Sequence, residues 1–160
     1  MSQRPPLNDG TRLPVDIRLR RILLVDDDLL SRRMALRLLE QFSFTEVIEA
    51  TNGSEALDVL ANSAFPIDLL IVDLIMPVMD GFDFIEQVRL GMKVPDPRVP
   101  IIVMSGRADP ETLQRVKKLG INGFVTKPPQ SRNFFERIVT AMRSAQAQAR
   151  ANEPQPRKMT

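Results

Sequence analysis

Aspartates follow two of the most apolar runs in this sequence. Residues 22–25 are apolar and lead directly into Asp26 and Asp27, and residues 69–72 lead into Asp73. Unbroken apolar runs of this length are typical of strands that are covered on both faces of a parallel sheet. Because a buried charge without a partner is costly, carboxylates at the ends of such strands indicate a chemical role.

Three carboxylates that converge on one crevice repel one another and reduce stability. A divalent cation removes this repulsion, and an all-oxygen ligand set that also receives phosphate suits Mg²⁺. The chain has no cysteine and no histidine, which excludes thiolate nucleophiles and the commonest nitrogen and sulfur metal ligands. The sequence therefore predicts a Mg²⁺ site, in which Mn²⁺ can substitute, with phosphate as the visiting group.

A carboxylate beside such a cation can attack phosphorus and form an aspartyl phosphate. Asp73 is the candidate nucleophile because it stands alone after its apolar run, whereas Asp26 and Asp27 form a pair suited to metal. Phosphoryl transfer relies on positioning and on positive charge at the phosphoryl oxygens. Lys127 would supply that charge, and Ser105 a hydroxyl hydrogen bond.

Apolar runs alternate with amphipathic segments along the chain. Strands are predicted at residues 22–25, 45–50, 69–72, 101–104 and 123–126, each followed by a helix. This alternation predicts a doubly wound α/β fold, a five-stranded parallel sheet in the order 2-1-3-4-5 with five helices on its two faces. In that order the aspartates fall where the strand order reverses between strands 1 and 3, at the carboxyl edge where ligands bind.

Four helix starts carry capping residues. Asp28, Asp80 and Asp109 are expected to be N-caps, the last of them with a proline directly after it. Asn52 is followed three residues later by Glu55, which is the spacing of a capping box. Asp28 and Asp80 are therefore interpreted as caps and not as metal ligands.

The length and composition fit one soluble domain with its own core. The chain has 160 residues, of which 43% are hydrophobic and 26% charged. No apolar run approaches the roughly 20 residues of a membrane span, and the N-terminus lacks the order of a signal peptide, so a cytoplasmic protein without membrane contact is expected. The domain is predicted at residues 21–143, between a flexible leader at 1–20 and a flexible tail at 144–160. Both ends are basic, but their basic residues are sparse and neither end has an aromatic residue that could stack on a base. Direct nucleic-acid binding is therefore not expected.

In order and spacing, these residues resemble the receiver domain of two-component response regulators. The motifs are Val25-Asp26-Asp27-Asp28, Asp73 with Met76-Pro77 and Asp80-Gly81, Ser105-Gly106, and Gly123-Phe124-Val125-Thr126-Lys127-Pro128. The resemblance covers about residues 20–143 and implies a flavodoxin-like fold. It also implies that the bond between Lys127 and Pro128 is cis.

By this resemblance, Asp73 accepts phosphate from a sensor histidine kinase or a histidine phosphotransfer protein. Asp27 would bind Mg²⁺ directly and Asp26 largely through water. The backbone carbonyl of Ile75 would complete the protein ligands.

The resemblance further implies a conformational switch. Ser105 would move toward the phosphate and Phe124 would turn inward, which remodels the face formed by the fourth helix, fifth strand and fifth helix. Pro129 departs from the family pattern, in which a large apolar or aromatic residue usually stands at this position. Ile75 and Arg107 occupy variable positions that influence phosphate loss. Since Ile75 cannot orient an attacking water, a long-lived phosphoryl group is expected.

The expected function is that of a stand-alone, chemotaxis-type receiver in a phosphorelay. It would switch contacts with an unidentified protein target, as a monomer or weak dimer, and would not be an enzyme beyond its own phosphorylation and dephosphorylation. The residues after Arg143 are too few for an output domain. One alternative is a receiver fragment of a larger transcription factor or hybrid kinase. A less favoured one is a Mg²⁺-dependent phosphohydrolase with an aspartate nucleophile, since those resembling haloacid dehalogenases have a second Asp where Ile75 stands.

Overall fold

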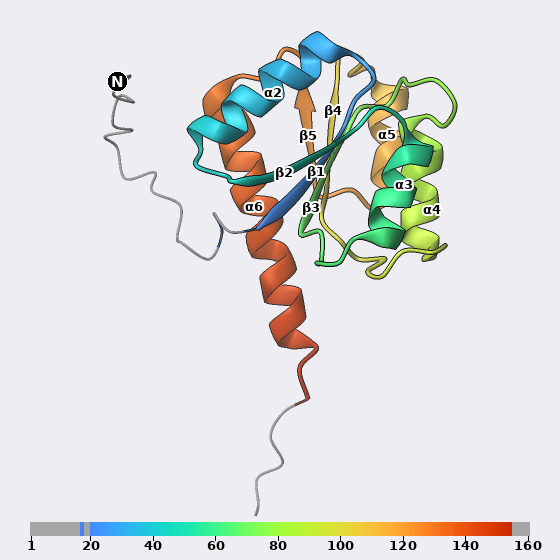
Figure 1. The fold of residues 1–160 in the computed structure, drawn as a ribbon, viewed down its shortest axis with the longest axis vertical. Helices are drawn as coiled ribbons and strands as arrows, with labels where there is room; N and C mark the ends of the chain where they lie inside the picture. Colours follow the sequence, from blue (N-terminus) through green and yellow to red (C-terminus); the bar gives the residue numbers. More distant parts are fainter. Residues whose placement is uncertain (1–16, 18–19, 155–160) are drawn as a thin grey trace, which may run out of the picture.

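The computed structural model describes Ile17 and residues 20–154, which form an α/β domain (Figure 1). The strands are β1 (Arg21–Val25), β2 (Glu46–Ala50), β3 (Leu69–Val72), β4 (Ile101–Ser105) and β5 (Gly123–Thr126). The helices that follow them are α2 (Leu29–Gln41), α3 (Gly53–Asn62), α4 (Gly81–Leu90), α5 (Pro110–Lys118) and α6 (Ser131–Ala151). All neighbouring strands are parallel, in the order β2-β1-β3-β4-β5, which confirms the predicted topology.

The sheet separates two apolar clusters. Because successive side chains of a strand point to opposite faces, Leu23 and Val25 of β1 pack with α3, α4 and α5, whereas Ile22 and Leu24 pack with α2 and α6. Figure 1 shows the same division, with α2 and α6 on one side of the sheet and α3, α4 and α5 on the other. Each large apolar side chain buried in this way contributes about 1.5–3 kcal/mol of transfer free energy.

The predicted N-caps are confirmed. The carboxylates of Asp28, Asp80 and Asp109 each accept a hydrogen bond from the backbone N–H three residues later. Asn52 Oδ1 accepts from the backbone N–H of Glu55 at 2.9 Å, and the Glu55 carboxylate accepts in turn from the backbone of the residue before Asn52. Each such cap is worth about 1 kcal/mol. Since every cap follows a strand, all these helices begin at the carboxyl edge of the sheet.

The last helix is longer than the sequence analysis expected. α6 continues to Ala151, so residues 144–151, which were assigned to a flexible tail, are helical and extend below the sheet in Figure 1. The expectation rested on the loss of large apolar residues after Arg143, but Ala, Gln and Arg have high intrinsic helix propensity. Apart from Ile17 and Arg20, the predicted leader lies outside the described residues, as do residues 155–160. Among the described residues, no helix has the length and apolar character needed to cross a bilayer.

Gly81 sits against the loop that follows β3. Its backbone N–H donates to the carbonyl of Leu74 at 2.9 Å. A Cβ atom at this position would lie only 2.1 Å from the carbonyl oxygen of Asp73 and 2.8 Å from the Cα of Leu74. No side chain fits into that space without moving the backbone, so the first turn of α4 is in direct contact with the residues at the end of β3.

We expect Gly81→Ala to lower the free energy of unfolding by about 1–3 kcal/mol, because the added methyl group must displace backbone atoms. Urea denaturation followed by circular dichroism measures this change. Gly106→Ala is the matched control, since a Cβ atom there meets nothing within 4 Å. Equal losses in the two variants would contradict the close approach at Gly81.

Candidate functional site

Three aspartates meet at the carboxyl edge of the two central strands. Val25 pairs with Val72 in the β1–β3 ladder, so Asp26 and Asp73 follow paired residues, and the backbone N–H of Asp73 donates to the Val25 carbonyl at 2.9 Å. One oxygen from each of Asp26, Asp27 and Asp73 lies within 4.8 Å of the others. Asp26 is fully buried and Asp73 is 7% exposed, whereas Asp27 is open to solvent. The arrangement is a partly buried, all-oxygen donor set.

Lys127 supplies the positive charge of the cluster. Its Nζ lies 2.7 Å from Asp26 Oδ2 and 3.2 Å from Asp73 Oδ2. The backbone N–H of Lys127 donates to the carbonyl of Ser105 at 2.9 Å, which continues the β4–β5 ladder, and the bond to Pro128 is cis as expected. A single ammonium group leaves the three carboxylates with an excess of negative charge. Their oxygens and their spacing fit a small divalent cation such as Mg²⁺.

Burial has opposite effects on the two kinds of charged group. Desolvation raises the pKa of the Asp73 carboxyl; the charge of Lys127 opposes this shift, and the charge of Asp26 adds to it. Desolvation alone would lower the pKa of Lys127, but its hydrogen bond with Asp26 and the charge of Asp73 raise it above the ordinary value. Lys127 is therefore firmly protonated at neutral pH, and it is the group that favours ionised Asp73.

The other predicted site residues surround the cluster without joining it. Ser105 is buried at the end of β4, and its hydroxyl accepts a hydrogen bond from the backbone N–H of Arg107 at 3.1 Å. Phe124 is partly buried and packs against the apolar cluster on the α3, α4 and α5 side. Ile75 lies in the loop after β3 with 57% of its surface exposed.

One contact of the site was missed by the sequence analysis. Arg32, on the first turn of α2, donates a hydrogen bond from Nη1 to the backbone carbonyl of Asp26 at 2.9 Å. No sequence signal indicates this contact, because only the packing of α2 over the end of β1 brings Arg32 to this carbonyl. The proximity of Gly81 to Asp73 was missed for the same reason.

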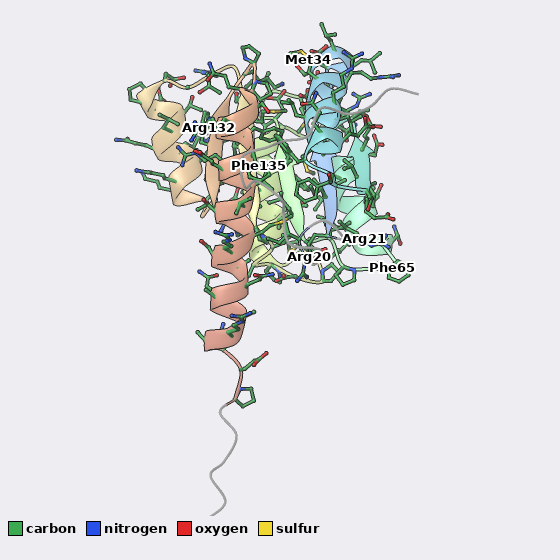
Figure 2. The ribbon with its side chains drawn as sticks, turned by 90° about the vertical axis from the view of Figure 1, so that its left-hand side faces the viewer. Arg20, Arg21, Met34, Phe65, Arg132 and Phe135 are labelled. Carbon is green, nitrogen blue, oxygen red and sulfur yellow. The ribbon has the colours of Figure 1, made fainter. Side chains whose placement is uncertain are left out.

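The edge of the sheet opposite the aspartates carries a cation–π contact and a cavity. Figure 2 shows Met34, on α2, at the upper edge, and Arg20, Arg21 and Phe65 at the lower edge. There the Arg21 guanidinium lies 4.2 Å from the centre of the Phe65 ring. A cavity of about 440 Å³ also opens at the lower edge, and none of the three aspartates nor Lys127 lines it. The charged cluster and this cavity are therefore separate features.

Comparison with known proteins agrees with this geometry. A family model described as the response regulator receiver domain matches residues 22–139. The chain belongs to this family. The receiver domain is 32% identical over 118 residues to the chemotaxis protein CheY of Pseudomonas aeruginosa, which covers 74% of this chain and 92% of that protein. It is also 33% identical over 107 residues to the sensor histidine kinase CheAY of Helicobacter pylori, of which it matches 13%.

Solved structures show the same fold. The structure of CheY4 from Vibrio cholerae matches the receiver domain with a TM-score of 0.68 and 29% identity, over 77% of this chain and 98% of that chain. A CheY-like receiver domain from Methanospirillum hungatei matches with a TM-score of 0.71 and 26% identity, over 81% and 98%. Membership of this family identifies the protein as a signalling protein whose role is to accept a phosphoryl group.

The pKa shift of Asp73 gives a testable pH dependence of stability. Because folding raises this pKa, ionisation of Asp73 destabilises the folded receiver domain. With metal chelated, wild type and Asp73→Asn should be about equally stable at acid pH, where the carboxyl is protonated in both folded and unfolded chains. The asparagine variant should become the more stable one as pH rises through the folded-state pKa, as measured by urea denaturation over a pH series.

Asp28→Asn is the control with the opposite sign. Hydrogen bonds from Ser31 lower the pKa of Asp28, so its ionised form stabilises the folded chain above the ordinary pKa, and that contribution is lost as pH falls. A wild-type protein that is more stable than Asp73→Asn at neutral pH without metal would contradict the assignment for Asp73.

Proposed function

We propose that Asp73 is the phosphoacceptor of this receiver domain. Asp27, Asp73 and the carbonyl of Ile75 would hold Mg²⁺, with Asp26 acting through water and Lys127 contacting the phosphoryl group. The observation that carries this proposal is the position of Lys127 Nζ, within 3.2 Å of both Asp26 and Asp73, in a cluster whose third acid is exposed. The cluster thus combines a buried nucleophile (Asp73), an ammonium group in a defined position (Lys127) and an acid that is open to solvent (Asp27).

The proposed reaction is a direct transfer of a phosphoryl group to Asp73. A carboxylate oxygen attacks the phosphorus of a phosphohistidine, the new O–P bond forms as the N–P bond breaks, and the electron pair stays on the imidazole nitrogen, which takes up a proton. Lys127 offsets negative charge on the phosphoryl oxygens, and its positive charge favours the ionised form of Asp73. Bound Mg²⁺ supplies further positive charge at these oxygens. The chemistry is limited to the protein's own phosphorylation and dephosphorylation.

Ser105 and Phe124 are proposed to report the phosphoryl group. The Ser105 hydroxyl now accepts from its own loop, and it can instead donate to a phosphoryl oxygen on Asp73. Ser105 pairs with Thr126 and Val103 pairs with Phe124, so β4 and β5 are joined at these positions. A shift at the end of β4 is thereby passed to the neighbouring strand. This would change the face formed by α5, β5 and α6, and with it the contacts made with a downstream protein.

The surroundings of the aspartates suit a protein phosphodonor. Large apolar side chains are exposed on both segments that follow the aspartates, namely Leu29, Leu30 and Met34 on α2 and Ile75 and Val78 after β3. Several exposed apolar side chains on adjoining segments indicate a protein contact. We infer that a sensor histidine kinase or a histidine phosphotransfer protein docks on this edge. The same chemistry would serve if the domain were part of a transcription factor or hybrid kinase.

Incubation with Mg²⁺ and acetyl phosphate should add one phosphate to the wild-type protein, as measured by intact mass. Asp73→Asn should gain none, because it lacks the nucleophilic oxygen. Asp28→Asn is the control, since Asp28 caps α2 and asparagine caps equally well. A phosphate on Asp73→Asn, or none on the wild type, would refute the assignment.

The phosphoryl group is expected to be long-lived, because the Ile75 side chain has no polar atom with which to orient an attacking water. Ile75→Gln should shorten the lifetime, measured by the decay of intact phosphorylated protein after removal of acetyl phosphate. Leu29→Gln is the matched control, since Leu29 is equally exposed and also follows a site aspartate. Rapid decay in the wild type would show that hydrolysis does not need a polar group at position 75.

A further inference from the structure

Arg32 links three segments at the edge of the acidic cluster. Its Nη1 donates to the backbone carbonyl of Asp26 at 2.9 Å, and its Nε donates to Glu49 Oε1 on β2 at 3.1 Å. The side chain is only 12% exposed, although it carries a charge on a surface helix. A guanidinium held by two acceptors in this way has one defined orientation.

The carbonyl that Arg32 binds belongs to the peptide group that joins Asp26 to Asp27. On the other side of Asp26, the backbone N–H donates to the carbonyl of Ala50 at 3.0 Å, and Asp26 Oδ1 accepts from the backbone N–H of Asp28 at 3.0 Å. Because a peptide group is planar, a hydrogen bond to its carbonyl fixes the direction in which the chain continues into Asp27. With the Arg32 hydrogen bond, the backbone N–H, the side chain and the backbone carbonyl of Asp26 each have a hydrogen-bond partner.

Asp27 depends on its backbone for orientation. Its side chain is exposed, and it makes no hydrogen bond or ion pair with any part of the chain that the structure describes. The other two aspartates differ, because Asp26 and Asp73 are both held by Lys127. Whatever aims the Asp27 carboxylate at the cluster must therefore act through the main chain.

We propose that Arg32 is the positioning residue for Asp27, and that it sets the affinity of the acidic cluster for a divalent cation through the Asp26 carbonyl. The proposal rests on the proposed function, in which Asp27 is a direct metal ligand. Groups that orient metal ligands from outside the coordination sphere typically change affinity by about 10–100-fold when removed.

Positioning and simple charge predict opposite signs. A positive charge near a cation site repels the cation, so if Arg32 acted only by its charge, its removal would tighten metal binding. If Arg32 holds the Asp26–Asp27 peptide, its removal must weaken metal binding. The pairing of Arg32 with Glu49 reduces the net charge effect, which leaves the positioning effect dominant.

The test measures Mn²⁺ affinity directly, from the loss of the free-ion electron paramagnetic resonance signal. The variants are Arg32→Met, which removes charge and hydrogen bonds, Arg32→Lys, which keeps the charge, and Arg33→Met as control. Arg33 is the exposed neighbour, which makes no hydrogen bond or ion pair with the described residues. We expect a dissociation constant about tenfold higher for Arg32→Met, a smaller increase for Arg32→Lys, and no increase for Arg33→Met.

A second readout separates positioning from general loss of structure. At saturating Mg²⁺, labelling of Arg32→Met by acetyl phosphate should return to the wild-type rate, while the Mg²⁺ concentration for half-maximal rate should rise by the same factor as the dissociation constant. Thermal unfolding in chelator identifies any variant that fails to fold, and Arg32→Lys then carries the comparison.

The outcomes are distinct. In one outcome, wild-type protein binds Mn²⁺ and is phosphorylated, but Arg32→Met binds Mn²⁺ equally well or more tightly. This would overturn the role of Arg32 and leave the proposed function standing. A labelling rate that stays low at saturating metal with unchanged affinity would also overturn the role of Arg32. Wild-type protein that binds no Mn²⁺ would remove the proposed metal site and the role of Arg32 together.

Discussion

The site depends on one ammonium group that contacts two carboxylates at the ends of buried strands. Lys127 Nζ lies 2.7 Å from fully buried Asp26 and 3.2 Å from Asp73. Without this partner, ionised carboxylates at such positions would be strongly destabilising. One ammonium group offsets only one of the three carboxylate charges in the described cluster, so an excess of negative charge remains. That excess makes the site suited to a hard metal ion and, with the metal, to a phosphoryl group.

The parallel ladder that builds the core also fixes the site. The backbone N–H groups of Asp26, Asp73 and Lys127 donate to the carbonyls of Ala50, Val25 and Ser105 on neighbouring strands. These charged residues therefore extend the hydrogen-bond ladder of the sheet by one step, and the ladder fixes the position of their backbones. Preorganisation of this kind lowers the cost of gathering charges during phosphoryl transfer.

The segments around α5 are held by contacts of another kind. Arg89 on α4 donates to the carbonyls of Val99 at 2.7 Å and Gly120 at 2.9 Å, and the Arg115 guanidinium on α5 lies 3.8 Å from the centre of the Phe82 ring. On α5 itself, Thr112 and Val116 are the buried residues. Polar and cation–π contacts can exchange partners with less loss of packing than a close-packed core, which resists small shifts. These contacts are consistent with the rearrangement proposed above for the face formed by α5, β5 and α6.

The sequence by itself determined the fold and the charged residues, because their signals are local. Apolar runs ending in Asp26 and Asp73 gave the strands, caps such as Asp109 gave helix starts, and the rules of parallel sheets then brought the aspartates to one edge. Only the tertiary structure decided which groups touch: that Lys127 binds both acids, that Gly81 leaves no room for a methyl group, and that Arg32 reaches the Asp26 carbonyl. Lys127 and Asp26 are 101 positions apart in the sequence. The contacts of Gly81 and Arg32 are shorter in sequence, but they depend on how α4 and α2 pack over the ends of the strands. Residue spacing carries no information about ångström-scale distances of this kind.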